Sequence, residues 1–171
     1  MCGDMMTLDL QRVNACSPYV LQESSRPLLY EFITDYGIDY TIGFALSDLL
    51  PGVECYEFVI INSNNRKSLR DYKLRETVYA LIYEFFSQPD AVMIYLCDTS
   101  DGKQEVRQRL FASWFYSADR KYSFNYLSST ITDDEGVENI VALLFRIDHP
   151  RAVQISGEFA RAVQLFHEKP E

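Results

Sequence analysis

The fold is decided by one segment, AVMIYLCDTSDGKQEVRQRLFASWF, residues 91–115. Its first six residues are apolar, which is typical of a central strand that is covered on both faces. A polar turn follows, and Val106, Leu110 and Trp114 then recur every four residues, as on one face of a helix over 103–115. The segment therefore predicts a buried strand that leads through an Asp/Ser/Gly turn into an amphipathic helix.

Four earlier segments predict β-strands. They lie at 19–21, 28–34, 38–45 and 55–61. Every second residue from Ile38 to Phe44 is apolar, which is the period of a half-buried strand. The turn Asp35-Tyr36-Gly37 precedes this strand, so it forms a hairpin with the strand before it. The last three of these strands have short connections, which predicts an antiparallel meander.

The segment from Ser68 to Ser87 predicts a helix, which Pro89 ends. Its apolar residues follow the spacing of one helical face. Ser68, with Asp71 three residues later, fits a capping arrangement at the start of this helix.

The C-terminal part predicts two long strands over 122–132 and 137–148, around an acidic turn that contains glycine, and a last helix over 150–166. The order is β-β-β-α-β-α-β-β-α, with a short strand before it. Strands grouped in hairpins, with helices between the groups, are typical of the α+β class. We expect a single mixed, mostly antiparallel sheet with two to three helices packed on one face. The expected organisation is a flexible N-terminal arm, a single α+β domain and a frayed tail, at 1–17, 18–167 and 168–171.

The composition limits the partners and the compartment. The chain has 171 residues, 16 Lys and Arg against 25 Asp and Glu, and a net charge of −9. Nucleic acids and anionic membranes attract concentrated positive charge, so neither is an expected partner, whereas a basic protein is compatible. The four cysteines have no CxxC spacing, and no signal-peptide pattern is present, so we expect no metal, no cofactor and a cytoplasmic location.

Two segments carry a resemblance to a known family. One is the aromatic hairpin YEFITDYGIDY, residues 30–40, and the other is the strand, turn and helix that begin with LCDTSDGKQ, residues 96–104. Together they resemble a family of small bacterial proteins of unknown function, over about Pro18 to Asp148. The resemblance implies a bacterial, cytoplasmic, single-domain protein. It implies no functional residues.

Asp98 and Asp101 are the first candidate site. Two carboxylates at the end of a strand could hold Mg²⁺ or Ca²⁺, or act as an acid and a base, which predicts a small metal-assisted enzyme as the alternative function. The loop with Asp133, Asp134 and Glu135 could add ligands only if it lies nearby. In the competing interpretation, Asp101 caps the helix and Asp98 accepts hydrogen bonds from turn N–H groups.

Two other groups lie near the same turn. Lys103 and Arg107, with the start of the helix, could bind an anion, although the two nearby carboxylates oppose this. Cys97 stands where a strand meets a helix, a place that lowers the pKa of a thiol. It would need a histidine such as His149 to act as a nucleophile, which requires their two strand ends to meet.

Large aromatic residues recur along the strands and suggest a binding surface. Tyr30, Tyr40 and Tyr56 are the candidate binding residues, and packing in the core is the alternative explanation. No arrangement of residues typical of an enzyme accompanies them. The sequence therefore favours a non-enzymatic protein-binding or regulatory module, which acts through an aromatic sheet face on another protein or on a second copy of itself.

Overall fold

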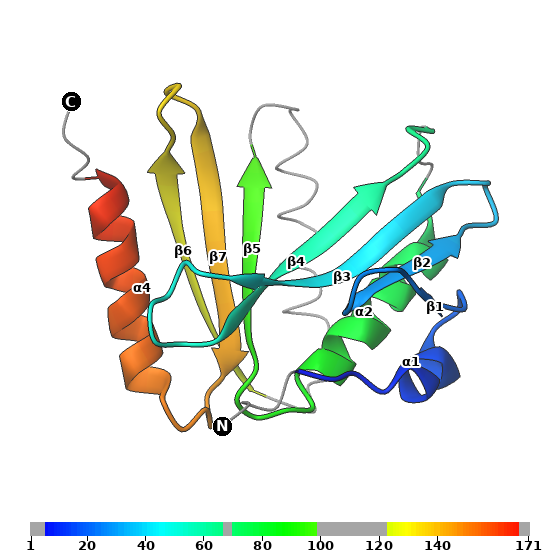
Figure 1. Cartoon of the computed structure of the whole chain (residues 1–171), viewed down its shortest axis with the longest axis horizontal. Coiled ribbons are helices and arrows are strands. Elements are labelled where there is room, and N and C mark those ends of the chain that lie inside the picture. The colour runs from blue at the N-terminus through cyan, green and yellow to red at the C-terminus, as the bar shows by residue number, and fades with distance from the viewer. Residues whose placement is uncertain (1–5, 67–69, 99–122, 168–171) are drawn as a thin grey trace. The chain divides into compact units, whose positions relative to one another are not determined.

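The computed structural model describes residues 6–66, 70–98 and 123–167 (Figure 1). In this part of the chain, seven strands form one mixed sheet in the order β1-β2-β3-β4-β5-β7-β6, accompanied by three helices. The elements are α1 Leu10–Cys16, β1 Gln22–Glu23, β2 Leu29–Ile33, β3 Asp39–Ser47, β4 Cys55–Asn62, α2 Tyr72–Phe85, β5 Val92–Asp98, β6 Phe124–Thr132, β7 Glu138–Arg146 and α4 Ala152–His167. The α+β class and the mixed sheet are confirmed, while the helix predicted over 103–115 lies outside the described residues.

The chain divides into two compact units. The first comprises Met1–Ala45 and Val59–Gln88, and the second comprises Leu46–Phe58 and Pro89–Glu171. The first unit holds α1, α2 and strands β1 and β2, with most of β3. The second holds β5, β6, β7 and α4.

The helix α2 of the first unit begins at an aspartate. The Asp71 carboxylate accepts hydrogen bonds from the backbone N–H groups of Lys73 and Leu74, at 2.9 and 3.3 Å. Asp71 is therefore the N-cap, three residues later than the predicted cap, while Ser68 itself lies outside the described residues. The helix α1 packs on α2, and the backbone N–H of Asp9 donates to the Glu84 carboxylate.

Aromatic side chains build the interior of the first unit. Tyr19, Phe32 and Tyr40 stack in a row, with ring centroids 5.5 and 5.7 Å apart. Phe44 of β3 stacks on Phe85 of α2 at 4.1 Å. Successive residues of a strand face opposite sides of a sheet, so Phe32, Tyr40 and Phe44 lie on one side of β2 and β3, and all three are buried.

Strand β5 is the buried centre of the second unit. It runs parallel to β4 and antiparallel to β7. Val92 and Ile94 are buried on one face, and Met93 and Tyr95 are buried on the other. The prediction of a central strand covered on both faces is confirmed.

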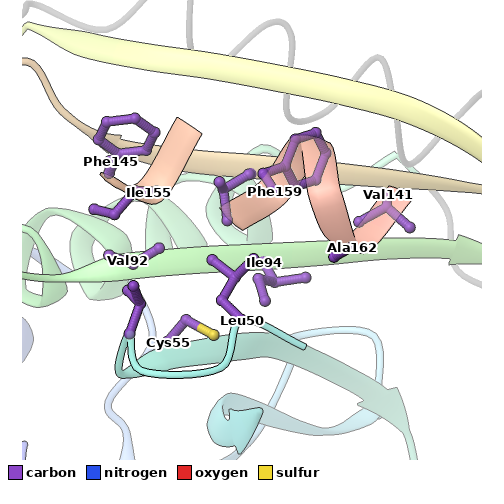
Figure 2. Close-up of a cluster of buried hydrophobic side chains, with 11 residues drawn as sticks. Leu50, Cys55, Val92, Ile94, Val141, Phe145, Ile155, Phe159 and Ala162 are labelled. Atoms are coloured by element: carbon purple, nitrogen blue, oxygen red, sulfur yellow. The ribbon is translucent and has the colours of Figure 1, made fainter. Parts of the chain in front are cut away.

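The last helix, α4, covers one face of this central strand. Figure 2 shows Ile155 and Phe159 of α4 in one cluster with residues of β5 and β7. The helix starts at Ala152, two residues after Pro150, close to the predicted start. The buried residues of α4 lie on one stripe, so burial of this stripe against the sheet stabilises the helix.

Candidate functional site

The predicted strand-to-helix turn is described only up to the end of its strand. Asp98 is the last residue of β5 and pairs with Asn139 of β7. The side chains of Cys97 and Asp98, and the residues Asp101, Lys103 and Arg107, lie outside the described part of the chain. The metal, acid–base and anion-binding hypotheses for this turn therefore stay predictions.

The acidic hairpin loop does lie at the same end of the sheet as Asp98. The register pairs Thr132 with Glu138 at the start of β7, next to the pair that Asp98 forms. The Asp133 carboxylate accepts hydrogen bonds from two backbone N–H groups of its own loop, both at 2.9 Å, so it closes the turn. Over residues 6–66, 70–98 and 123–167, no group of three His, Cys, Asp or Glu side chains could hold a metal ion.

His149 and Cys97 lie at opposite ends of β5. His149 follows β7 and contacts Asp90, just before β5 begins, whereas Cys97 is near the end of that strand. Seven residues of extended strand span about 20 Å, so the fold does not bring the two residues together.

Both ring nitrogens of His149 are used by the backbone. Nδ1 accepts from the N–H of Arg151 at 2.9 Å, so the ring proton is assigned to Nε2, which lies 3.1 Å from the carbonyl oxygen of Asp90. The side chain is buried. His149 therefore links the start of β5 to the start of α4 and has no nitrogen left for a catalytic proton transfer.

The three candidate tyrosines face the interior. Tyr30, Tyr40 and Tyr56 are all buried, and burial raises the pKa of Tyr30. In β2 and β3, the aromatic residues share one face because Tyr30 pairs with Ile42 and Phe32 pairs with Tyr40. Any surface that these two strands offer to a partner is therefore made by the residues between the aromatic ones.

We call the exposed side of these strands the open face, and define it by six residues of the first unit: Val20, Gln22, Glu31, Ile33, Asp39 and Thr41. In the register, Glu31 lies between Gln22 of β1 and Thr41 of β3, and Ile33 lies opposite Asp39. Val20 and Ile33 are 67% and 66% exposed, which is high for large aliphatic side chains. The six residues line a hollow of about 500 Å³, together with Phe32, Tyr40 and Ser63.

The open face carries the negative charge of Glu31 and Asp39, and Arg66 lies beside it at the Gly37 turn. No ion pair within the described residues involves Glu31 or Asp39. The described residues that line the hollow include no lysine and no arginine. A nearby cation, Lys73, is paired with Asp35 at 2.7 Å.

The sequence alone does not reveal the open face. Its signal was the alternation of Glu31 and Ile33 with the aromatic residues of β2. Both sides of this strand carry apolar residues, so the alternation alone does not show which side is covered. The aromatic side is the covered one because helices pack on it, and this packing is a tertiary contact that strand periodicity does not reveal.

The fold and the open face describe an α+β protein with a hollowed, acidic and partly aliphatic sheet surface. The chain belongs to a family of unknown function, DUF6169, whose family model matches residues 70–159. This match confirms the resemblance to a family of unknown function, although the hairpin at 30–40 and the open face lie before the matched segment. No curated protein and no solved structure matches the chain. Among the described helices, none is long and apolar enough to cross a membrane.

Proposed function

We propose that this protein is a non-enzymatic protein-binding module, and that its open face is the binding surface. The observation that carries the proposal is the pair of exposed aliphatic side chains, Val20 and Ile33, in one hollow of about 500 Å³. Exposed apolar side chains that gather in a concave surface and are rimmed by polar groups are typical of interaction sites. Binding there would remove apolar surface from water, which favours association.

The groups in the hollow support binding more than catalysis. Its polar side chains are two carboxylates, one amide and two hydroxyls, apart from a buried tyrosine. Acyl-transfer and proton-transfer sites usually pair a nucleophile or an acid with a base. Among the described residues that line the hollow, no histidine, cysteine or lysine offers such a partner.

We also propose that the chain is located in the cytoplasm of a bacterial cell and that its partner is a protein there. The net charge of −9 opposes association with a nucleic acid. Cys16 and Cys55 are free thiols, which agrees with a reducing compartment. Fractionation of the host cell tests the compartment, and recovery of the chain in an extracytoplasmic fraction would contradict it.

Site-specific photo-crosslinking in the host cell tests the binding surface. A photoreactive amino acid replaces Ile33 in one variant and Val153 in the control variant. Val153 is 90% exposed on α4, so the control probe has full access to solvent in the second unit. We expect one discrete crosslinked product, the chain joined to a second protein, from position 33 and none from position 153.

Two results would overturn the proposal. One is the absence of any product from position 33, or the same products from both positions. The other is a product with twice the mass of the chain, which would mean that a second copy of the chain, and not a separate protein, binds the open face.

A further inference from the structure

We infer that the open face recognises an extended segment with two basic residues, Lys or Arg, at positions i and i+2. This inference rests on the proposed function and names the chemistry of the partner. It depends on the spacing of the two carboxylates, on the absence of an ion pair between either of them and a described residue, and on the aliphatic side chains beside them.

The spacing follows from the register of β2 and β3. Glu31 lies directly opposite Thr41, and Asp39 precedes Thr41 by two residues on the same strand. Asp39 is therefore the diagonal neighbour of Glu31 on the same face, and diagonal neighbours lie about 7–8 Å apart. In an extended chain, side chains at i and i+2 point to the same side and are about 6.6–6.8 Å apart. Two basic residues with this spacing can each reach one carboxylate.

The charges of the open face favour a basic occupant. Glu31 is exposed and Asp39 is half-buried, and neither forms an ion pair with a described residue. A cation placed between or above two like charges relieves their repulsion and gains attraction to both. The described lining of the hollow includes no lysine and no arginine, so a basic partner adds the opposite charge there.

The remaining residues of the open face suit the stems of such side chains. Lys and Arg carry aliphatic stems that cover apolar surface while the charged group stays in water. Val20 and Ile33 provide that apolar surface next to the carboxylates. Gln22 and Thr41 lie on either side of Glu31 and can donate to or accept from the backbone of the segment.

A second copy of the chain fits this surface poorly. Each copy carries a net charge of −9, so two copies repel each other at low salt. A basic segment of another protein gains from the same charge. Charge complementarity therefore selects a separate, basic partner.

Peptide titration followed by ¹⁵N–¹H NMR tests the inference on the full chain. The probe is the peptide STKVKTS, with its lysines at i and i+2. The control peptide STKKVTS has the same composition and charge, but its adjacent lysines point to opposite sides when the chain is extended. We expect STKVKTS to shift amide signals of the open face, and STKKVTS to bind at least about fivefold more weakly.

Two variants with matched charge decide the role of the carboxylates. Glu31→Gln with Asp39→Asn removes both charges with little change of shape, and we expect affinity for STKVKTS to fall about tenfold. Glu135→Gln with Glu138→Gln removes two charges from the β6–β7 hairpin of the second unit, and we expect affinity within about twofold of the wild type. Retained dispersion of the amide signals verifies that both variants are folded.

Equal affinity for the two peptides, or equal affinity of the Glu31/Asp39 variant and the wild type, would overturn the inference. The crosslinking experiment separates this failure from failure of the proposed function. If the product from position 33 persists in the Glu31→Gln/Asp39→Asn variant, the open face is still the binding surface, but the proposed preference for basic residues is wrong. If the wild-type chain gives no product, the binding surface itself is wrong.

Discussion

At the scale of single residues, Tyr19 connects three segments of the first unit. Its hydroxyl donates to the Asp71 carboxylate at 2.7 Å and accepts from the backbone N–H of Asp35 at 3.2 Å. Its own backbone N–H donates to the Thr77 hydroxyl at 3.3 Å, and its ring stacks on Phe32. One side chain therefore holds the N-terminal segment, the turn before β3 and the start of α2 together.

Replacing Tyr19 by Phe should destabilise the protein, because the ring stacking remains while two hydrogen bonds are lost. The Asp71 carboxylate still caps α2, so we expect the free energy of unfolding to fall by about 1–2 kcal/mol. Urea denaturation measures the change. Tyr36→Phe, at a tyrosine that is 50% exposed, serves as the control and should be neutral. Equal stability of Tyr19→Phe and the wild type would contradict this role.

The pH dependence of stability provides a second test of Tyr19. Burial, with the nearby Asp71 and Asp35 carboxylates, raises the pKa of Tyr19 from 10.0 to about 12. The folded chain then keeps a proton that the unfolded chain loses, so this contribution to stability is complete below pH 10 and declines between pH 10 and about 12. We expect the stability difference between wild type and Tyr19→Phe to shrink over this range. A stability difference that stays constant or grows between pH 10 and about 12 would contradict a raised pKa of Tyr19 in the folded chain.

At the scale of elements, the β2–β3 pair depends on one glycine. Gly43 has a φ of +155°, and a Cβ there would lie 1.9 Å from the carbonyl oxygen of Leu28. The same oxygen accepts a hydrogen bond from the backbone N–H of Phe44 at 3.0 Å. The two backbones approach so closely that no side chain fits at position 43.

Gly43→Ala should therefore be among the most destabilising single changes. We expect a loss of about 3 kcal/mol or more, because the clash is with backbone and cannot be relieved by a rotamer change. Gly157→Ala in α4 is the matched control, since a Cβ there meets nothing within 4 Å. This control should gain about 0.5–1 kcal/mol, because alanine favours helix more than glycine. Thermal unfolding measures both variants, and similar melting temperatures would contradict the account of β2–β3.

The sequence predicted most of the described helices and strands, but it did not predict the cap of α2 or the exposed side of β2 and β3. The alternation over 38–45 and the apolar run at the start of β5 indicate strands, and both strands are present. Asp71 caps α2, and the sequence did not fix the first residue of this helix, because the capping residue depends on where the chain turns into the helix. The exposed side of β2 and β3 depends on how α1 and α2 dock, so the open face could not be found from strand periodicity.

At the scale of the whole molecule, the acidic charge shapes association. The net charge of −9 favours solubility and opposes self-association, while it attracts basic partners. We expect light scattering on the purified chain at low salt to give the mass of one copy. A stable dimer at low salt would contradict the argument that a separate basic protein, and not a second copy, occupies the open face.

A competition experiment with the two peptides measures whether paired basic residues occupy the open face. The chain with a photoreactive residue at position 33 is irradiated in a host-cell extract, with an excess of either STKVKTS or STKKVTS. If the natural partner binds the open face through two basic residues, STKVKTS should suppress the crosslinked product and STKKVTS should leave it largely intact. A product that survives STKVKTS, or that both peptides suppress equally, would contradict the account.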